Sequence, residues 1–229
     1  MAGSSNLWKR PRRVQRRAGF TLTELLVTLG ILTLLAALLF PAFALVRGRS
    51  RMATCASNLH QLGQAATLYE QDNENLFPRC ADPLDLNTTV WASAGSKYWP
   101  LVQTLPPIQS VLLPYAKDAE LFDCPSDTGF DYSTMAPGFP LAARPTSYGA
   151  FGTSYYYHTE LPLDGLSIAN LTAIQAGPPL TEVGPDSISL LFDGTDQWHG
   201  GRLNVLYVDG HVKSQSQDQL DASWNQTLQ

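Results

Sequence analysis

The feature that most constrains this chain is an apolar run close to its N-terminus, residues 20–46. It reads FTLTELLVTLGILTLLAALLFPAFALV, and its one ionisable residue is Glu24. An α-helix needs about 20 apolar residues to cross a bilayer core, whereas the apolar part of a secretory signal has about 7–15. The sequence therefore predicts that residues 20–46 form one helix that inserts into a membrane. Gly30 and Pro41 are tolerated in such a helix, although Pro41 should loosen it.

The basic residues predict how that helix is oriented. Residues 1–19 hold six of the fifteen Lys and Arg residues and no acid. Because positive flanks stay in the cytoplasm, we expect residues 1–19 inside and the chain after residue 47 outside the inner membrane. Three arginines, at 47, 49 and 51, weaken this bias without reversing it. Without residues 1–19 the chain has nine basic and twenty acidic residues, and this net charge of −11 argues against a nucleic-acid partner.

Glu24 is a functional candidate, because a carboxylate inside an apolar helix is costly. The alternative is that Glu24 merely sits at the membrane interface. A cut after Gly19 would create a charged amine on Phe20. In an assembly, Glu24 of a neighbouring subunit could pair with that amine, and a buried pair of this kind would fix the register between subunits.

The string RRAGFTLTELLVTLGILTLLAALLFPAF resembles the N-terminus of type IV pilins and type II secretion pseudopilins. The resemblance implies that a prepilin peptidase cuts after Gly19 and methylates Phe20, and that Glu24 is the assembly carboxylate. It also implies a homo- or hetero-oligomeric filament of pilin-like subunits that takes part in protein secretion or forms a pilus. Pro41 falls where many such pilins carry a helix-loosening proline.

A second cleavage site competes with this interpretation. Ala42-Phe43-Ala44 is an A-x-A pattern, after which a signal peptidase could cut. The length of the apolar run and the presence of Glu24 inside it favour the cut before Phe20. N-terminal sequencing of the exported protein distinguishes a start at Phe20 from a start at Leu45.

The helix is expected to continue beyond the membrane over residues 47–76, packed on the body. Apolar residues recur there at steps of three and four, which is one helical stripe. They are Met52, Cys55, Leu59, Leu62, Ala66 and Tyr69. The helix should end near residue 74, since Pro78 prevents further winding. His60 lies beside the stripe and is expected to be solvated.

The body, residues 77–229, is predicted to be β-rich with long loops. In its first part we expect residues 111–127 to form a short helical turn followed by a loop held by Cys124, and residues 146–160 to form an extended aromatic strand. Later, SISLLFDGT (187–195) reads as a buried strand. RLNVLYV (202–208) and HVKS (211–214) read as a hairpin with Asp209-Gly210 as a two-residue turn. The fold class is therefore α+β: a long N-terminal helix followed by an antiparallel sheet.

The string WHGGRLNVLYVDGHVK places nine residues between His199 and Asp209-Gly210. It is similar to the C-terminal H-X9-DG signature of a large group of pilin-like proteins associated with prepilin processing. The strings NLHQLGQAATLYEQDNENLFP and LLPYAKDAELFDCPSD resemble the same group. This resemblance implies a pilin-like body and says little about chemistry.

The three cysteines match no zinc-binding spacing. If the body lies outside the cytoplasm, we expect a Cys80–Cys124 disulfide, with Cys55 left on the helix. The sequence does not fix the connectivity, so the other pairings stay open.

Asp193, Asp196 and Asp209 are the candidate metal ligands. They flank loops that we place at the same end of the sheet, and oxygen-rich loops suit calcium. Major pseudopilins resembling this chain can bind calcium in their C-terminal loops. The alternative is that these residues only form turns.

Catalysis is not expected. His199, Asp209 and His211 come without a nucleophile elbow, an HExxH helix or a phosphate loop, so the chain is predicted not to be an enzyme.

One further function stays open beside the filament subunit: a membrane-anchored extracytoplasmic binding protein. Its aromatic side chains would stack on a glycan or another polymer. The candidates are Trp91, Trp99, Trp198 and Tyr155–Tyr157. Buried aromatic side chains are the commoner case.

Overall fold

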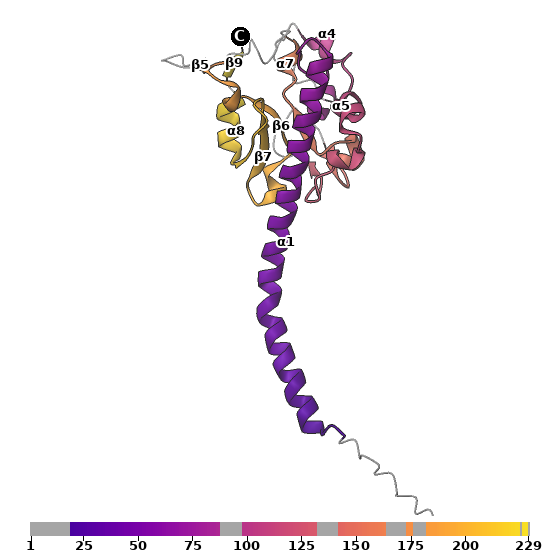
Figure 1. Ribbon diagram of the computed structural model, residues 1–229, viewed down its shortest axis with the longest axis vertical. Coiled ribbons are helices and arrows are strands. Elements are labelled where there is room, and N and C mark those ends of the chain that lie inside the picture. Colours follow the sequence, from indigo (N-terminus) through magenta and orange to yellow (C-terminus); the bar gives the residue numbers. More distant parts are fainter. Residues whose placement is uncertain are drawn as a thin grey trace, which may run out of the picture. The chain divides into compact units, whose positions relative to one another are not determined.

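A computed structural model describes residues 19–87, 98–131, 142–163, 173–175, 182–224 and 226–228. The chain divides into two compact units, Met1–Leu45 and Val46–Gln229. The predicted α+β class is confirmed, because a long N-terminal helix precedes antiparallel β-sheets (Figure 1).

Helix α1 runs from Leu22 to Asp72 and therefore covers most of both segments that the sequence predicts to be helical, 20–46 and 47–76. It ends where the backbone becomes left-handed at Glu74 and Asn75, with φ of 57° and 61°. The amide of Asn75 donates to the carbonyl of Glu70 at 2.8 Å. This bond satisfies one of the carbonyls that every helix leaves unpaired at its C-terminus.

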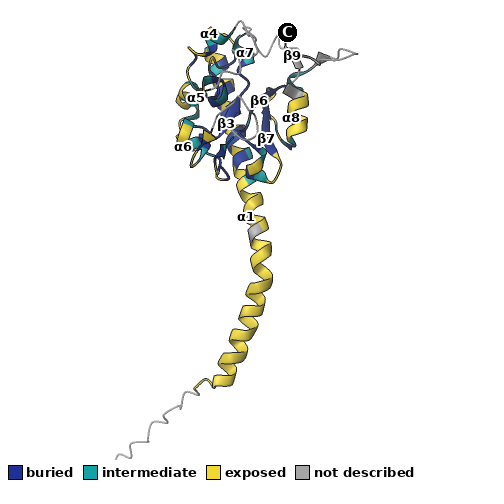
Figure 2. Cartoon of the chain, turned by 180° about the vertical axis from the view of Figure 1, so that it is seen from behind, coloured by how far each residue is buried: buried dark blue, intermediate teal, exposed yellow. Residues whose placement is uncertain are grey.

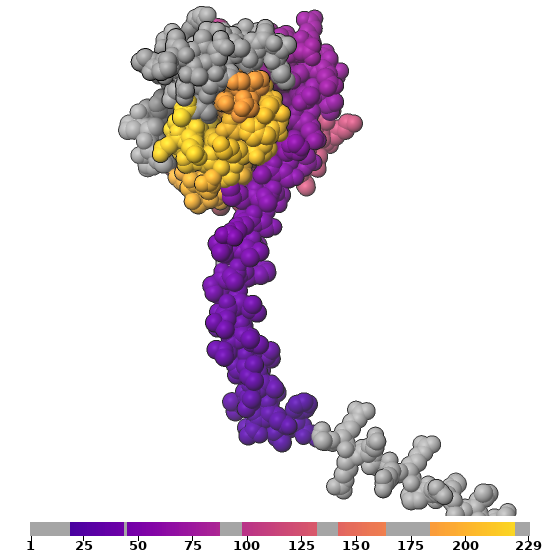
Figure 3. Space-filling model, turned by 60° about the vertical axis from the view of Figure 1, so that its left-hand side comes forward, coloured from indigo at the N-terminus to yellow at the C-terminus, as the bar shows by residue number. Residues whose placement is uncertain are grey.

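The second half of α1 buries the predicted apolar stripe. Its fully or almost fully buried apolar residues are Cys55, Leu59, Leu62, Ala65 and Ala66. The stripe lies close to the sheet, because a Cβ atom added at Gly63 would be 3.0 Å from the methyl carbons of Leu206. The same half of the helix lies against the C-terminal part of the chain in the space-filling view (Figure 3).

The main sheet has four antiparallel strands in the order β3-β6-β7-β8. They are β3 (Tyr155–Tyr157), β6 (Ser189–Asp193), β7 (Leu203–Tyr207) and β8 (Val212–Gln215). The register pairs Ser189 with Tyr207 and Phe192 with Val205. All five residues of β7 are buried, so this strand lies in the core between its neighbours (Figure 2).

Two smaller sheets and several short helices complete the described residues. The strands are β1 (Phe130–Asp131) with β2 (Ala142–Ala143), and β5 (Glu182–Val183), β4 (Ala173–Gln175) and β9 (Gln226–Leu228). The α-helices are α2 (Pro83–Asn87), α4 (Trp99–Val102), α5 (Ile108–Ala116), α6 (Ser147–Phe151), α7 (Glu160–Leu163) and α8 (Gln217–Trp224). The 3₁₀ helices are η1 (Ala119–Phe122), η2 (Pro185–Ser187) and η3 (Asp196–His199).

The predicted strand over 146–160 is wrong in its first part, which forms α6. Thr146 caps this helix by accepting a hydrogen bond from the amide of Gly149, and Gly152 ends it with a φ of 80°. Ser and Thr caps together with a terminal glycine favour a helical turn over the extended backbone that the aromatic residues suggest. Only Tyr155–Tyr157 keeps the expected strand.

The predicted hairpin between β7 and β8 is confirmed, but its loop has three residues and not two. The amide of Tyr207 donates to the carbonyl of His211, and the amide of Gly210 donates to the carbonyl of Tyr207, each at 2.9 Å. Gly210 has a φ of 89°. A three-residue loop with a left-handed glycine at its end is the next common hairpin after the two-residue turns.

The predicted Cys80–Cys124 disulfide is wrong. Cys124 is joined to Cys55, and Cys80 is a free, buried thiol. The pairing follows from packing: Cys55 lies on the buried stripe of α1, and its Cα is 5.0 Å from that of Cys124. Asn58 fixes the loop on the helix by donating from Nδ2 to the Asp123 carbonyl at 2.9 Å. Closing a loop with a sequence separation of 69 stabilises the fold by about 4 kcal/mol in the chain-entropy treatment.

Candidate functional site

The first half of α1 exposes apolar side chains along most of its length. In this segment the large side chains are exposed by half or more, for example Leu25, Leu38 and Phe40. Among the described residues α1 is the one helix long and apolar enough to cross a membrane. An apolar surface of this size requires either lipid or another protein against it.

The N-terminus of α1 is closed by a capping box formed by Thr21 and Glu24. The amide of Thr21 donates to Oε2 of Glu24 at 2.9 Å, and the amide of Glu24 donates to Oγ1 of Thr21 at 3.3 Å. The Thr21 hydroxyl also donates to the same Oε2 at 2.7 Å. This reciprocal pairing is the T-x-x-E pattern of helix starts, and it could have been read from the sequence.

Gly19 and Phe20 lie immediately before that cap, outside the helix and exposed to solvent. Phe20 is 87% exposed, and a Cβ added at Gly19 would meet no atom within 4 Å. Each hydrogen bond that Glu24 accepts uses Oε2, which leaves Oε1 for a further partner.

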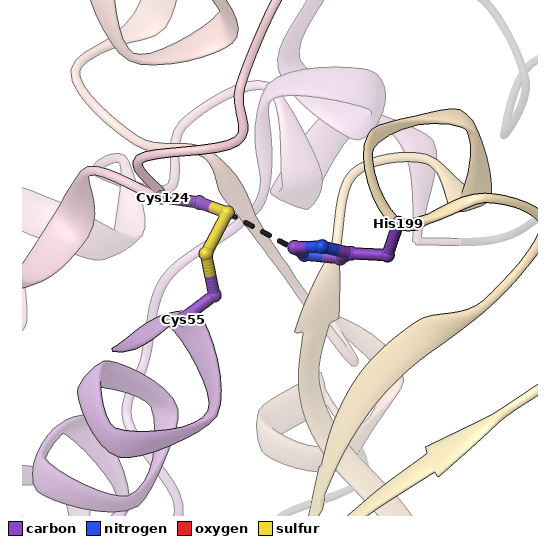
Figure 4. Close-up of side chains that lie close together, drawn as sticks. All are labelled: Cys55, Cys124 and His199. Atoms are coloured by element: carbon purple, nitrogen blue, oxygen red, sulfur yellow. Dashed lines mark hydrogen bonds between the residues drawn. A yellow bond between two sulfur atoms is a disulfide. The ribbon is translucent and has the colours of Figure 1, made fainter. Parts of the chain in front are cut away.

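A second group of reactive side chains surrounds the disulfide. His199, the last residue of η3, places its Nε2 3.6 Å from Sγ of Cys124 (Figure 4). The same Nε2 lies 3.1 Å from Oδ2 of Asp193, and both side chains are buried. Thr195 caps η3 at its start and Gly200 ends it with a φ of 67°, so the local sequence holds His199 at this point.

Asn204 fixes the carboxylate of this group. Its backbone amide donates to Oδ2 of Asp193 at 2.7 Å, and its side-chain Nδ2 donates to the same oxygen at 3.0 Å. Oδ1 of Asp193 is buried and has no hydrogen-bond partner among the described residues. The sequence patterns single out Asp193 and His199 separately and predict neither their contact with each other nor the contact of His199 with the disulfide.

The H-X9-DG residues do not form one site. His199 precedes β7, whereas Asp209 and Gly210 follow it, so the nine intervening residues include the whole strand. Asp209 contacts Nδ1 of His211 through Oδ1 at 2.6 Å. The carbonyl of Gly210 lies 3.2 Å from Nδ1 of His60. His60, expected to be only solvated, therefore connects the hairpin turn to α1.

The three predicted calcium ligands are not brought together, and the prediction that they share one end of the sheet is wrong. Asp193 ends β6, while Asp209 lies beyond Tyr207, which pairs with the first residue of β6, Ser189. In an antiparallel pair these positions are at opposite ends, about 13 Å apart along the strand. Asp196 starts η3 on the Asp193 side.

The aromatic residues proposed to hold a glycan are mostly in the core. Tyr155, Tyr156, Tyr157 and Trp198 are buried, and Trp99 packs against a small apolar cluster. Trp91 lies outside the described residues. These side chains therefore give no open stacking surface, and the binding-protein alternative loses its support among the described residues.

Several titratable groups are buried away from the disulfide. Burial lowers the pKa of His158 to about 4 and raises the pKa of Glu70 to about 7. Burial, followed by the charge of Asp85, raises the pKa of Asp82 well above its ordinary value. Burial also raises the pKa of the Cys80 thiol, which makes this thiol a poor nucleophile.

The comparison with protein families agrees with the N-terminal motif. Residues 14–40 match the family described as prokaryotic N-terminal methylation motif. No curated protein and no solved structure matches the chain. The chain thus carries a prepilin-type N-terminal motif on a long apolar helix.

Proposed function

We propose that this chain is the precursor of a structural subunit of a type IV pilus-like or type II secretion pseudopilus filament. The observation that carries the proposal is the methylation motif over residues 14–40, because it coincides with the exposed apolar part of α1. The motif supports processing by a prepilin peptidase and assembly with other pilin-like subunits. The H-X9-DG resemblance of the body agrees with this role.

In this proposal the peptidase cuts after Gly19, removes the basic leader 1–19 and methylates the new N-terminal Phe20. The exposure of both residues, and their place before the first turn of α1, support the proposal. A peptidase needs an accessible, non-helical peptide bond, and Gly19 and Phe20 both lie outside the helix and are exposed.

Residues 20–46 then hold the subunit in the inner membrane, with residues 47–76 and the body, 77–229, on the extracytoplasmic side. The Cys55–Cys124 disulfide supports this orientation, since such bonds form and persist in oxidising compartments.

During assembly the apolar part of α1 leaves the lipid and packs against the same part of neighbouring subunits. The Phe20 amine, which becomes buried in that packing, requires a negative partner. Glu24 of the adjacent subunit supplies it through Oε1, while Oε2 continues to cap its own helix. Glu24 therefore has one structural and one assembly role, on different oxygens.

Three substitutions separate these roles. Glu24→Gln keeps the capping box, which accepts either Glu or Gln, but removes the charge. Thr21→Ala weakens the cap and keeps the charge, and Glu24→Ala removes both. We expect all three precursors to be processed, whereas only Thr21→Ala assembles filaments at close to the normal yield. The measurement is filament yield after shearing from cells, with the processed subunit quantified by mass spectrometry.

Mass spectrometry of the mature wild-type protein is the control for processing, and it should show N-methylated Phe20 as the first residue. Normal filaments from Glu24→Gln would contradict the charge mechanism. A mature chain beginning at Leu45 would contradict the proposed function itself.

A further inference from the structure

We infer that Cys55, Cys124, His199 and Asp193 form a binding site for a thiophilic divalent cation, expected to be Zn²⁺, when the Cys55–Cys124 pair is in its dithiol form. The site lies wholly within the compact unit Val46–Gln229 and does not depend on filament assembly.

The donor atoms of this site are already close together. Among the described residues, Cys55, Cys124 and His199 are the one group of three ligating side chains whose donor atoms all lie within 4.8 Å of one another (Figure 4). Two thiolates and an imidazole are ligands that zinc prefers, and a carboxylate completes many four-coordinate sites. Asp193 lies beside this group, with its Oδ2 3.1 Å from the imidazole Nε2, but it is not one of the three residues whose donors are all within 4.8 Å of one another. Its carboxylate becomes the fourth ligand if it turns towards the sulfur atoms.

Two of the separations between these donors are close to the edges of a zinc tetrahedron. With a Zn–S bond of about 2.3 Å and a Zn–N bond of about 2.0 Å, sulfur and nitrogen ligands are about 3.6 Å apart. Cys124 Sγ and His199 Nε2 are separated by 3.6 Å. Nitrogen and oxygen ligands are about 3.4 Å apart in the same geometry, close to the 3.1 Å found here.

The Asp193 carboxylate and the two sulfur atoms must move. In a tetrahedral site the sulfur atoms are about 3.8 Å apart, which requires the S–S bond to be broken and one cysteine side chain to rotate. The backbones of Cys55 and Cys124, with their Cα atoms 5.0 Å apart, can stay in place.

The charge in the reduced site also favours a cation. Cys55, Cys124 and Asp193 are all at most 1% exposed, so two thiolates and a carboxylate would share one dry region. A divalent ion offsets that negative charge. It also gives Oδ1 of Asp193, which is buried without a hydrogen-bond partner among the described residues, a positive neighbour. Asn204 already orients this carboxylate through two hydrogen bonds, as an outer ligand shell requires.

The chemistry balances as two steps. A dithiol reductant, which is oxidised to a disulfide, or a phosphine, which is oxidised to its oxide with oxygen from water, supplies two electrons. Together with two protons, these electrons convert the Cys55–Cys124 disulfide into two thiols. Zinc then binds both sulfurs and releases those two protons. Reoxidation by a disulfide-type oxidant removes two electrons from the thiolates, restores the S–S bond and frees the ion.

The test uses the full chain, purified in detergent with its disulfide intact and checked for cooperative unfolding. After reduction with a phosphine, the protein is titrated with Co²⁺ as a spectroscopic probe and with Zn²⁺ against a chromophoric chelator. We expect one ion per reduced chain, with the thiolate-to-metal absorption of a tetrahedral Co²⁺ site, and no binding to the oxidised chain. His199→Ala should weaken binding by more than about tenfold. His60→Ala, which removes an exposed histidine, should not. Equal binding by both variants, or by the oxidised chain, would overturn the inference.

A second measurement needs no variant. Zn²⁺ should slow alkylation of Cys55 and Cys124 in the reduced wild-type chain by tenfold or more, and leave the buried Cys80 as it was. Each cysteine is followed by mass spectrometry of its peptide. Alkylation of Cys55 and Cys124 at an unchanged rate would equally overturn the inference, whether or not His199→Ala folds.

Discussion

Glu70 shows how a single buried residue makes the stability of the body depend on pH. It lies near the end of α1 and is 4% exposed, and burial raises its pKa from 4.5 to about 7. Between these two values the folded chain binds more protons than the unfolded chain. The free energy of unfolding therefore falls as the pH rises through this range, and the loss is complete once the pH exceeds the folded-state pKa.

The prediction at this scale is that Glu70→Gln stabilises the protein at about pH 8 and that the gain shrinks towards about pH 5. The neutral amide does not carry the cost of a buried charge. Thermal unfolding of the full chain in detergent at both pH values measures the effect. Asp72→Asn, at an exposed position two residues away, is the control and should give no pH-dependent gain. A gain for Glu70→Gln that is equal at both pH values would contradict burial as the cause.

Two glycines with nearly the same φ angle differ in how closely neighbouring atoms approach them. Gly129 has a φ of 72° and Gly200 a φ of 67°. A Cβ at Gly129 would lie 2.2 Å from the carbonyl oxygen of Ala143, in strand β2, whereas a Cβ at Gly200 would meet no atom within 4 Å. The first position requires glycine for space as well as for its dihedral angles.

We therefore expect Gly200→Ala to cost about 1 kcal/mol, the usual cost of a left-handed alanine. Gly129→Ala should cost at least twice as much, because the loop before β1 must also move away from β2. Denaturant unfolding of both variants with the disulfide intact gives the comparison. Similar losses for the two variants would show that the contact with Ala143 adds nothing to the conformational cost.

The elements that the sequence predicts well are those with a long or simple pattern. The apolar run in the first half of α1, the 3.6-residue period in its second half and the apolar runs of β6 and β7 are each continuous, so few other structures suit them. Helix α6 was missed because its cap at Thr146 and its glycine at 152 outweigh the strand preference of the aromatic residues. The three-residue loop at Gly210 differs from the prediction only in where the strand hydrogen bonds stop.

Sites that draw on distant segments could not be predicted in the same way. The residues around the proposed cut before Phe20 are neighbours in sequence, so one motif match over residues 14–40 includes all of them. The group at the disulfide needs Cys55, Cys124 and His199, which are separated by 69 and 75 residues. Burial does not distinguish Cys55 from Cys80, since both are completely buried. Only the packing of α1 against the loop after η1 selects the pair.

For the whole molecule, the uneven charge of the chain and its disulfide are connected. If the six basic residues of the leader hold residues 1–19 in the cytoplasm, the body is exported, and Cys55 and Cys124 can then be oxidised. The number of free thiols per chain therefore reports the orientation of the protein in the membrane. An exported chain keeps one free thiol, that of Cys80, and a chain that stays in the cytoplasm keeps three.

Neutralising four leader residues to Gln leaves two basic residues before the helix against three after it, and should raise the fraction of chains with three free thiols. The four residues are Lys9, Arg10, Arg12 and Arg13. Thiols are counted by alkylation of whole cells under denaturing conditions, followed by mass spectrometry. Replacing Arg47, Arg49 and Arg51 by Gln is the matched control, and it should leave one free thiol because it strengthens the bias. If the leader variant also keeps one free thiol, the orientation is set by the length of the exported body and not by the leader charge, because long domains can cross the membrane regardless of flanking charge.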